Sequence, residues 1–389
     1  MTVGIPRETF PDERRVGVVP RTCEVLKKLG LSILVETSAG AAAGFPDAEY
    51  EARGARLASR PEVFEGADVV VQVRTLGANP DMGRQDVPLF RSGQALIGFS
   101  EPLTALAESA ALKAAGVSLF AMELVPRITR AQSMDALSSM ATIAGYEAVL
   151  IGATSLPKIF PMLMTAAGTI TPSKVFVLGA GVAGLQAIAT ARRLGAVVCA
   201  YDVRPAVREQ VESVGARFIA LEIEAGTSED KGGYAKAMGE DFYRKQRELL
   251  TGVLREQDVV ITTAAVPGKK APILITREMA EAMPPGSVIV DVAAERGGNC
   301  ELTRPGETVI HQGVTILGPL NLPSRSAHHA SQMYGSNVAA LLKLLVKNGE
   351  LAIDLGDEII RETLVTHGGK VVNTRVMELM EQAPTARMA

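Results

Sequence analysis

The chain has 389 residues, 47% of them hydrophobic, with 37 glycines and 21 prolines. This length and composition are typical of an ordered globular protein with two or three domains, and they exclude a disordered chain, a fibrous repeat and a disulfide-stapled miniprotein. The net charge of -3, from 43 acidic and 40 basic side chains, supplies no positive field for the phosphates of nucleic acid, so we expect no nucleic-acid partner.

The N-terminal third of the chain alternates short apolar runs with helical segments. A helix is predicted from Pro20, with Leu26 and Leu29 on one face, and Gly30 stands in the usual helix-stop position. Apolar runs separated by helices are typical of a parallel sheet that helices cover on both faces. The predicted strands are Val3–Ile5, Leu31–Val35, Val69–Val73, Leu96–Phe99 and Ser118–Met122.

A second series of the same kind begins at Val175. A helix joins the two series, because apolar residues recur at intervals of three and four from Met134 to about Ile151. Two sheets predict two lobes with a cleft between them. The later strands of this series are Val197–Tyr201, Val259–Thr263, Val288–Asp291 and Val314–Leu317.

The C-terminal region contains one segment that is apolar nearly all round, Val338–Val346, which predicts a buried helix. We infer that the chain returns there to the first lobe. The predicted fold class is therefore α/β, with two Rossmann-like doubly wound parallel-sheet domains separated by a cleft. The first domain is discontinuous, residues 1–137 and 322–389, and the second comprises residues 138–321.

No metal site, disulfide or membrane span is indicated. Cys23, Cys199 and Cys300 match no zinc-binding spacing, so we expect reduced thiols. The amino terminus lacks the apolar core of a signal peptide. Residues 159–172 come nearest to a membrane segment, but they are fewer than the roughly 20 that a span needs and they include Pro161. We expect a soluble, cytoplasmic chain that reaches a membrane only through a partner.

A glycine fingerprint follows the strand that begins at Val175. Gly179 permits a tight turn, Gly181 lets a pyrophosphate approach the backbone, and Gly184 lets helix and strand pack closely. The start of the next helix offers unpaired N–H groups and a positive dipole end to the phosphates. The alternative is a glycine turn that binds nothing. The predicted phosphate-binding residues are Gly179, Ala180, Gly181, Val182, Ala183 and Gly184.

The following strand ends in Asp202, 23 residues after Gly179. A carboxylate at this position can accept both ribose hydroxyls of the adenosine but repels a 2'-phosphate, so the sequence predicts NAD rather than NADP. The nearby Arg204 weakens that preference. Val203, together with Ala264 and Ala265 after the next strand, completes the predicted cofactor-binding set.

Residues 222–241 form a glycine-rich polar segment that is too long for a simple connection. One interpretation is a lid that carries Tyr234 and Met238 onto the bound nucleotide, and the other is a solvated insertion.

Acid–base chemistry has few candidate residues in this chain. Its four histidines, at positions 311, 328, 329 and 367, all follow the glycine fingerprint. A dehydrogenase that oxidises an alcohol or amine needs a proton acceptor, whereas hydride transfer between two nicotinamides needs none. Motifs of P-loop NTPases and serine hydrolases are missing as well.

A polar cluster precedes the connecting helix. Arg127 could hold a phosphate or an amide, and Gln132 and Asp135 lie within one helical turn and could bond each other. The alternative is a purely structural capping box formed by Thr129 and Gln132.

Several of these motifs together resemble a known superfamily. Gly4–Glu8, the fingerprint with Asp202, and residues 291–298 (DVAAERGG) are similar to alanine dehydrogenases and nicotinamide nucleotide transhydrogenases, over the chain to about Asn373. Arg127, Gln132 and Asp135 resemble the Arg-Gln-Asp loop in the NAD(H)-binding component of the proton-translocating transhydrogenases. Residues 232–238 (GGYAKAM) resemble the mobile loop of that component.

The sequence departs from the alanine dehydrogenase branch. That branch carries a substrate-binding lysine after the third strand and a catalytic histidine after the fourth, where this chain has Arg74 and residues 98–102 (GFSEP). Glu295 stands where that branch has aspartate. These differences favour a transhydrogenase. An NAD-dependent amino-acid dehydrogenase is the alternative, and a non-catalytic nucleotide sensor is a third hypothesis.

The resemblance implies a division of labour. This chain would bind NAD(H), a separate component would bind NADP(H), and a membrane subunit would conduct protons at the inner membrane. Hydride transfer would be direct and of the Si-to-Re type. The resemblance also implies a homodimer, with a hairpin at Leu364–Val372 near its interface. Among the site residues, it implies that Arg127 holds the nicotinamide end, Gln132 reaches the partner's NADP(H), Asp135 positions its neighbours, Ser138 bonds the carboxamide and Tyr234 closes over the adenosine.

Overall fold

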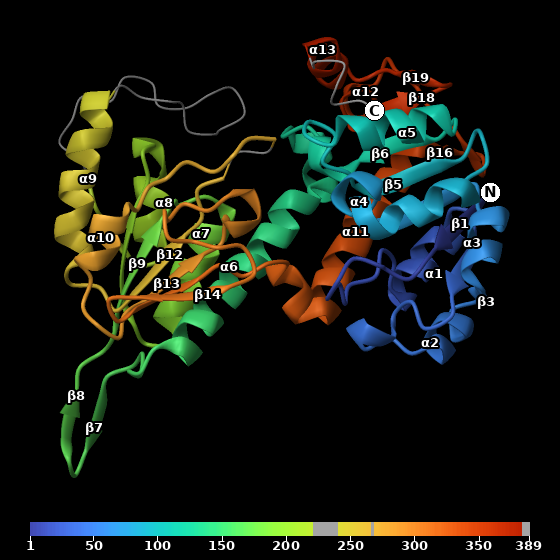
Figure 1. Ribbon diagram of the computed structural model, residues 1–389. Coiled ribbons are helices and arrows are strands. Elements are labelled where there is room, and N and C mark those ends of the chain that lie inside the picture. The colour runs from blue at the N-terminus through green and yellow to red at the C-terminus, as the bar shows by residue number, and fades with distance from the viewer. Residues whose placement is uncertain (221–239, 266–267, 383–389) are drawn as a thin grey trace. The chain divides into compact units, whose positions relative to one another are not determined.

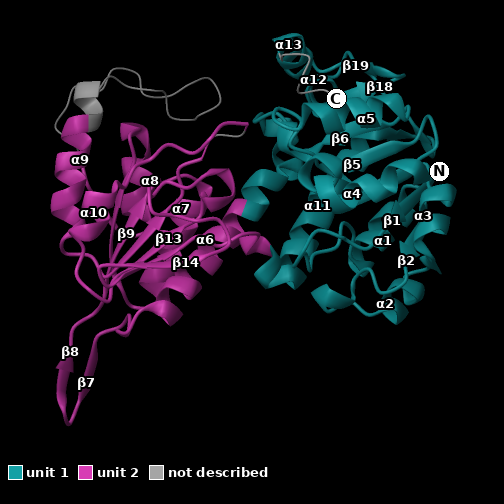
Figure 2. Cartoon of the chain, in the orientation of Figure 1, with its two compact units in different colours: residues 1–140, 324–389 teal, residues 141–323 magenta. Residues whose placement is uncertain are grey.

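The computed structural model describes residues 1–220, 240–265 and 268–382. The chain divides into two compact units, residues 1–140 with 324–389 and residues 141–323 (Figure 2). Each unit contains one sheet of mainly parallel strands with helices packed on it, which confirms the predicted α/β class with two Rossmann-like sheets.

The sheet of unit 1 has the doubly wound strand order (Figure 1). Its order is β19-β18-β6-β5-β4-β1-β2-β3, and all pairs from β6 to β3 are parallel. The strands are β1 (Thr2–Ile5), β2 (Ser32–Glu36), β3 (Arg56–Ala58), β4 (Val69–Arg74), β5 (Ala95–Phe99), β6 (Ser118–Ala121), β18 (Leu364–His367) and β19 (Lys370–Val371). The helices of at least six residues that start in this unit are α1 (Pro20–Lys28), α2 (Asp47–Ala52), α3 (Arg60–Gly66), α5 (Leu106–Ala114), α6 (Ala136–Ser155), α11 (Ala327–Leu345), α12 (Glu358–Thr363) and α13 (Thr374–Gln382).

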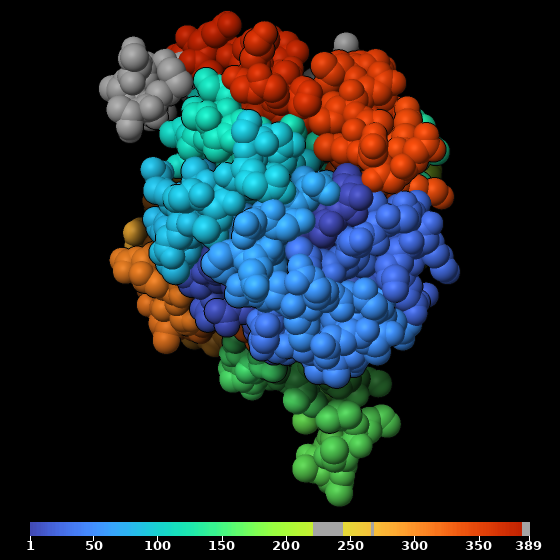
Figure 3. All heavy atoms as spheres, turned by 90° about the vertical axis from the view of Figure 1, so that its right-hand side faces the viewer, coloured from blue at the N-terminus to red at the C-terminus, as the bar shows by residue number. Residues whose placement is uncertain are grey.

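The C-terminal region of the chain completes unit 1. Helix α11 is largely buried, and the hydroxyl of its Tyr334 donates to the Gln72 carbonyl at 2.7 Å. Strand β18 adds to the sheet edge by antiparallel pairing with β6, and β18 and β19 form the predicted hairpin. Figure 3 shows the C-terminal residues, in orange to red, adjoining the blue and cyan N-terminal residues on one surface of unit 1.

The sheet of unit 2 repeats the same strand order. Its order is β11-β10-β9-β12-β13-β15-β14, parallel throughout except for the edge strand β14. The strands are β9 (Lys174–Leu178), β10 (Val197–Tyr201), β11 (Arg217–Phe218), β12 (Val259–Thr262), β13 (Val288–Asp291), β14 (Thr308–His311) and β15 (Val314–Leu317). Helices α7 (Val182–Arg193), α8 (Arg208–Ser213), α9 (Glu240–Leu254) and α10 (Arg277–Glu281) connect them.

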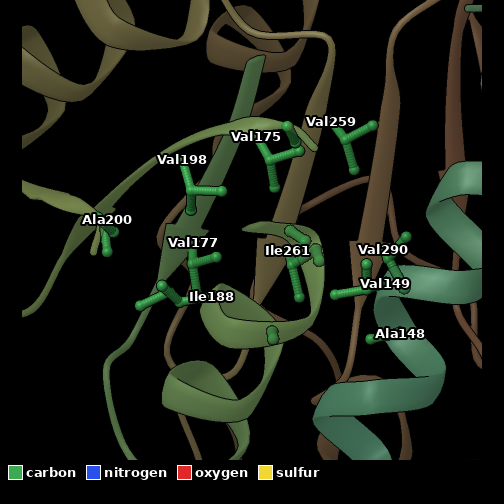
Figure 4. Close-up of a cluster of buried hydrophobic side chains, with 14 of the residues drawn as sticks. Ala148, Val149, Val175, Val177, Ile188, Val198, Ala200, Val259, Ile261 and Val290 are labelled. Atoms are coloured by element: carbon green, nitrogen blue, oxygen red, sulfur yellow. The ribbon is translucent and has the colours of Figure 1, made fainter. Parts of the chain in front are cut away.

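One core of unit 2 joins helices α6 and α7 to the sheet (Figure 4). Side chains from four central strands meet Ile188 of α7 and Ala148 and Val149 of α6 there. Full burial of an aliphatic side chain contributes about 1.5–3 kcal/mol, so this cluster fixes α7 firmly against the strand that precedes it. The strand residues that Figure 4 labels are Val175, Val177, Val198, Ala200, Val259, Ile261 and Val290.

One helical prediction is corrected by the structure. The buried C-terminal helix begins at Ala327, well before Val338, because its first turns expose polar residues such as His329 and so lack the all-round apolar pattern. Residues 159–172, which come nearest to a membrane segment in the sequence, contain the exposed hairpin β7 (Leu163–Thr165) and β8 (Gly168–Ile170).

Among the described residues one helix, α6, is long and apolar enough to cross a membrane by length and composition, and 44% of its most apolar window is buried. Its Ala148 and Val149 belong to the core of unit 2, and core helices of this kind pass the same test of length and hydropathy.

Substitution of Gly145 by alanine tests the contact between α6 and α7. A Cβ atom at Gly145 would lie 2.1 Å from the carbonyl oxygen of Ala183, so the helices must separate. We expect Gly145→Ala to lower the free energy of unfolding by about 1–3 kcal/mol in urea denaturation.

The matched control is Gly252→Ala in α9. A Cβ atom at Gly252 meets nothing within 4 Å, so alanine should stabilise the helix by about 0.5–1 kcal/mol. Equal effects of the two substitutions would contradict the close approach of α6 to α7.

Candidate functional site

The turn after β9 has the geometry that its glycines predict. Gly179 has a φ of +96°, a conformation that favours glycine. A Cβ atom at Gly184 would lie 1.9 Å from the carbonyl oxygen of Gly179, so only glycine lets α7 approach the turn. A Cβ atom at Gly181 would meet nothing within 4 Å. The packing of the protein therefore explains Gly179 and Gly184, whereas Gly181 faces open space that a ligand can use.

Helix α7 presents its N-terminus at this turn. It begins at Val182 with Gly181 as the N-cap, and its first turn contains no acidic residue. The first N–H groups of a helix have no partner within it and lie at the positive end of its dipole. The turn lies between the neighbouring strands β9 and β12, where the strand order reverses and where doubly wound sheets bind their ligands. This arrangement can bind a phosphate group.

Asp202 connects the end of β10 to the glycine turn. One carboxylate oxygen, Oδ2, accepts the N–H of Ala180 at 2.7 Å and the Nη2 of Arg204 at 2.9 Å. The other, Oδ1, accepts the backbone N–H and the Nε of Arg204, both at 2.9 Å. Asp202 is only 9% exposed. The carboxylate therefore holds both the turn and the arginine two residues later.

The loop after β12 is fixed by a residue that the sequence analysis missed. Buried Asn299 accepts the N–H of Ala264 at 3.0 Å and donates to the carbonyl of Ala264 at 2.8 Å. The N–H of Asn299 donates in turn to the fully buried Asp291 at 2.7 Å. Asn299 directly follows the motif at residues 291–298, so its adjacency to that motif was the available signal.

The Arg127 segment forms a 3-10 helix, Thr129–Met134, followed directly by α6. The proposed capping box of Thr129 and Gln132 is wrong, because Ile128 occupies the N-cap position and no side chain caps this helix. The capping residue is Asp135, whose carboxylate accepts the N–H of Ser138 at 2.8 Å and its hydroxyl at 2.5 Å. The Asp135 carboxylate therefore bonds Ser138, at the start of α6, and Asp135 meets Gln132 through its backbone N–H, which donates to the Gln132 carbonyl at 3.3 Å.

Helices from the C-terminal region of the chain hold this segment. Arg130 forms an ion pair of 2.6 Å with Asp357, which caps α12, and Asn337 of α11 donates to the Ser133 carbonyl at 2.9 Å. The backbone is thus fixed at several points, while the side chains of Arg127 and Gln132 lie exposed on unit 1.

Buried charges surround the carboxyl edge of the unit 1 sheet. Glu13 binds Arg15 at 2.6 Å and Arg74 at 3.3 Å. Burial opposes ionisation of Glu13, but the adjacent Arg15 guanidinium lowers its pKa to about 2. Burial, with the negative charge of Glu13 adding, raises the pKa of Glu8 to about 8. A pocket of about 340 Å³ lies here, lined among others by Arg7, Glu8, Glu13 and Arg15.

Three charged residues of this pocket, Glu8, Glu13 and Arg15, already have partners in unit 1. The Glu8 carboxyl accepts the N–H groups of Val73 at 2.6 Å and Arg74 at 3.1 Å. The Arg74 guanidinium lies 4.3 Å from the centre of the Phe10 ring, besides its contact with Glu13. An arginine stays protonated at physiological pH and cannot accept a proton. The edge therefore has an arginine, Arg74, at the end of β4, and no histidine in residues 98–102.

The predicted site residues fall into two groups. In unit 2, residues 179–184 and 202–204 meet through the bond from the Ala180 N–H to the Asp202 carboxylate. Ala264 lies beside them, because a Cβ atom added at Gly179 would be 3.3 Å from the Ala264 backbone nitrogen. In unit 1, Arg127, Gln132, Asp135 and Ser138 lie on one continuous segment. Residues 222–239 of the predicted lid, with Tyr234 and Met238, lie outside the described residues, and its last two residues, 240 and 241, begin α9.

Cys23, Cys199 and Cys300 are free and buried. Within the stretches of chain that the structure describes, no three His, Cys, Asp or Glu side chains are grouped as metal ligands.

Comparison with known proteins defines the family. The "Alanine dehydrogenase/PNT, N-terminal domain" model matches residues 4–144, and the corresponding C-terminal domain model matches residues 148–374. The chain therefore belongs to the alanine dehydrogenase/PNT family.

Individual relatives come from both branches of that family. The chain is 46% identical to an NAD(P) transhydrogenase alpha subunit of Rhodospirillum rubrum, over 96% of this chain and 98% of that protein. It is 30% identical to the alanine dehydrogenase of Halomonas elongata, over 97% and 96% of the two chains. The solved transhydrogenase structure from Sinorhizobium meliloti matches with a TM-score of 0.87 and 45% identity, over 96% of this chain and all of that one.

The pKa of Glu123 generates a prediction about stability. Burial, followed by the negative charge of Glu101, raises its pKa from 4.5 to about 7. Its Oε1 accepts the N–H groups of Ser100 and Glu101, so Oε2 can carry the proton. Because the folded protein binds this proton more tightly, the stabilisation is complete below about pH 4.5 and is lost as the pH rises through about 7.

Glu123→Gln should remove this dependence. The free energy of unfolding of the unsubstituted protein, relative to the variant, should fall between about pH 5 and 7, by at most about 1.4 kcal/mol per pH unit. It should then be constant above about pH 8. A relative stability that rises with pH in urea denaturation would show that the buried carboxyl is ionised.

Proposed function

We propose that this chain is the NAD(H)-binding component of a proton-translocating transhydrogenase of the Si-to-Re specific type. In this proposal NAD(H) bound here exchanges a hydride directly with NADP(H) on a separate component, and a membrane subunit couples the exchange to proton movement. One observation carries the proposal: a nucleotide-binding turn in unit 2 is combined with a unit 1 edge where Arg74 replaces the lysine and residues 98–102 offer no histidine. The similarity to transhydrogenase alpha subunits over 96% of the chain supports it.

The residues of unit 2 fit a dinucleotide. The open space at Gly181 suits the pyrophosphate, and the N–H groups of Val182, Ala183 and Gly184 at the start of α7 would bind it. Asp202 would accept the hydroxyls of the adenosine ribose. The proposed lining also includes Gly179, Ala180, Val203, Arg204, Ala264 and Ala265, with Tyr234 over the adenosine.

The residues of unit 1 are proposed to act at the nicotinamide end. Bound NAD(H) supplies the hydride chemistry, and the protein contributes orientation and exclusion of water. Arg127 would hold the nicotinamide end of NAD(H), and exposed Gln132 would reach the partner's NADP(H). Asp135 fixes the start of α6 through Ser138, whose hydroxyl oxygen would bond the carboxamide. No proton transfer by a side chain is required.

The assembly follows from the same proposal. The chain would act as a homodimer together with the NADP(H)-binding component and the membrane subunit. It would be held at the inner membrane by those partners, on the cytoplasmic side.

An NAD-dependent amino-acid dehydrogenase is the second candidate. The pocket of about 340 Å³ beside Arg15 and the 30% identity to an alanine dehydrogenase favour it. Against it, Glu13 already binds Arg15, and Glu8 already accepts two backbone N–H groups. Of these groups, Glu8 is the one whose pKa, raised by burial to about 8, would let it exchange a proton near neutral pH, and its carboxyl already accepts two backbone N–H groups.

The decisive assay is reduction of an NAD analogue by NADPH with and without a recombinant NADP(H)-binding component. We expect turnover only when that component is present, because this chain presents one nucleotide and its partner the other. Oxidation of L-alanine by NAD with the purified chain alone would replace the proposal with the amino-acid dehydrogenase.

Gln132→Asn tests the positioning role. Because shortening this exposed side chain by one methylene displaces the amide from the partner nucleotide, we expect hydride transfer to slow by about 10-fold to 100-fold. The affinity for NADH should change little. The control is Gln85→Asn, an exposed glutamine of unit 1 outside the proposed site, which should leave both quantities unchanged. A chain that only senses nucleotides would show no effect of either substitution.

A further inference from the structure

Asp202 is saturated with hydrogen bonds in this structure. A carboxylate offers about four lone-pair positions. Two are taken by backbone N–H groups, of Ala180 and Arg204, and two by the Nε and Nη2 atoms of the Arg204 guanidinium, all within 2.9 Å. The side chain of Asp202 is 6% exposed and that of Arg204 is 16% exposed. Asp202 therefore cannot also accept two ribose hydroxyls while the guanidinium stays in place.

The four bonds differ in how easily they can be given up. The N–H of Ala180 belongs to the glycine turn, and the N–H of Arg204 belongs to the main chain at the end of β10. Neither can leave without moving the backbone of the site. The guanidinium, at the end of a flexible side chain, can rotate away while the backbone bond of Arg204 keeps Asp202 in position.

We infer that Arg204 is a specificity-determining residue that competes with the adenosine ribose for Asp202. This inference rests on the proposed function, since it concerns the NAD(H) site. The simplest interpretation is that Asp202 is an unoccupied acceptor for the ribose hydroxyls, and this inference replaces it. Binding of NAD(H) must first separate a bidentate, charge-assisted pair, which is among the stronger polar contacts that a protein makes.

The same arginine acts in the opposite direction on NADP(H). A lone Asp202 carboxylate would repel a 2'-phosphate. The Arg204 guanidinium offsets that charge at 2.9 Å, and the fork of a guanidinium matches the geometry of a phosphate. Arg204 therefore weakens binding of NAD(H) and strengthens binding of NADP(H). The affinities of the site for the two nucleotides thus differ less than they would without Arg204.

The test is a set of dissociation constants measured with the purified full-length chain. The ligands are NADH, NADPH and the NADH analogue that lacks the 2'-hydroxyl of the adenosine ribose. The binding of each ligand is measured by calorimetry. We expect Arg204→Ala to bind NADH roughly 3-fold to 10-fold more tightly and NADPH more weakly by a similar factor. The 2'-deoxy analogue should gain less than NADH, because it makes only one of the two hydroxyl bonds.

Two further variants control for folding and for charge. Arg204→Lys keeps the positive charge but loses the planar fork, so its affinities should lie between those of the unsubstituted protein and Arg204→Ala. In a background of Asp202→Asn, Arg204→Ala should no longer improve NADH binding, because the contested carboxylate is gone. Thermal melts establish that each variant is folded before its binding is interpreted.

The outcomes separate this inference from the proposed function. Unchanged or weaker NADH binding by both folded Arg204 variants overturns the inference alone. Failure of the unsubstituted chain to bind NADH overturns both. Expected affinities combined with no hydride exchange in the presence of the partner component overturn the proposed function and leave the competition at Asp202 standing.

Discussion

The close approach of α7 to the turn at Gly179 is the constraint on which the rest of the site depends. With only glycine possible at position 184, the helix starts directly against the strand end, with Gly181 and its open space at the N-cap. The hydrophobic core that includes Val177 of β9 and Ile188 of α7 holds the helix in this position. Helix α6 packs on the same spot through Gly145. The nucleotide-binding geometry is thus a consequence of backbone packing, with few polar side chains involved.

Unit 1 has the same sheet topology, but the carboxyl edge of its sheet differs from that of unit 2. Its carboxyl edge has buried charges that neutralise one another, with Glu13 between Arg15 and Arg74. Breaking a buried pair of this kind leaves an uncompensated charge at a cost of about 3–5 kcal/mol, so these groups are committed to holding the loops. The segment from Arg127 to Asp135 has exposed side chains, and the C-terminal helices hold its backbone through Arg130 and Asn337.

The sequence predicted what depends on local pattern and missed what depends on pairing across the chain. Strands such as Val197–Tyr201 and Val314–Leu317 were predicted to the residue, because buried parallel strands are short runs of apolar residues. The alternative of a capping box at Thr129 and Gln132 was wrong, and Asp135 is the cap, because several positions in this segment fit a capping pattern and only the backbone decides between them. The bonds of Asn299 to Ala264 and the occupied state of Asp202 could not be predicted, because each depends on partners in three dimensions.

Under the proposed function, the pair of Asp202 and Arg204 lies where discrimination has to occur. NAD and NADP share the nicotinamide that reacts and differ only by the phosphate on the adenosine ribose, so residues at the reacting end cannot tell them apart. A site that accepted either nucleotide would allow exchange between two identical cofactors, with no net reaction. Strong selection through an unpaired Asp202 would instead bind NAD(H) tightly and delay its release. When Arg204 competes for Asp202, the site still prefers NAD(H), but it binds NAD(H) weakly enough to release it.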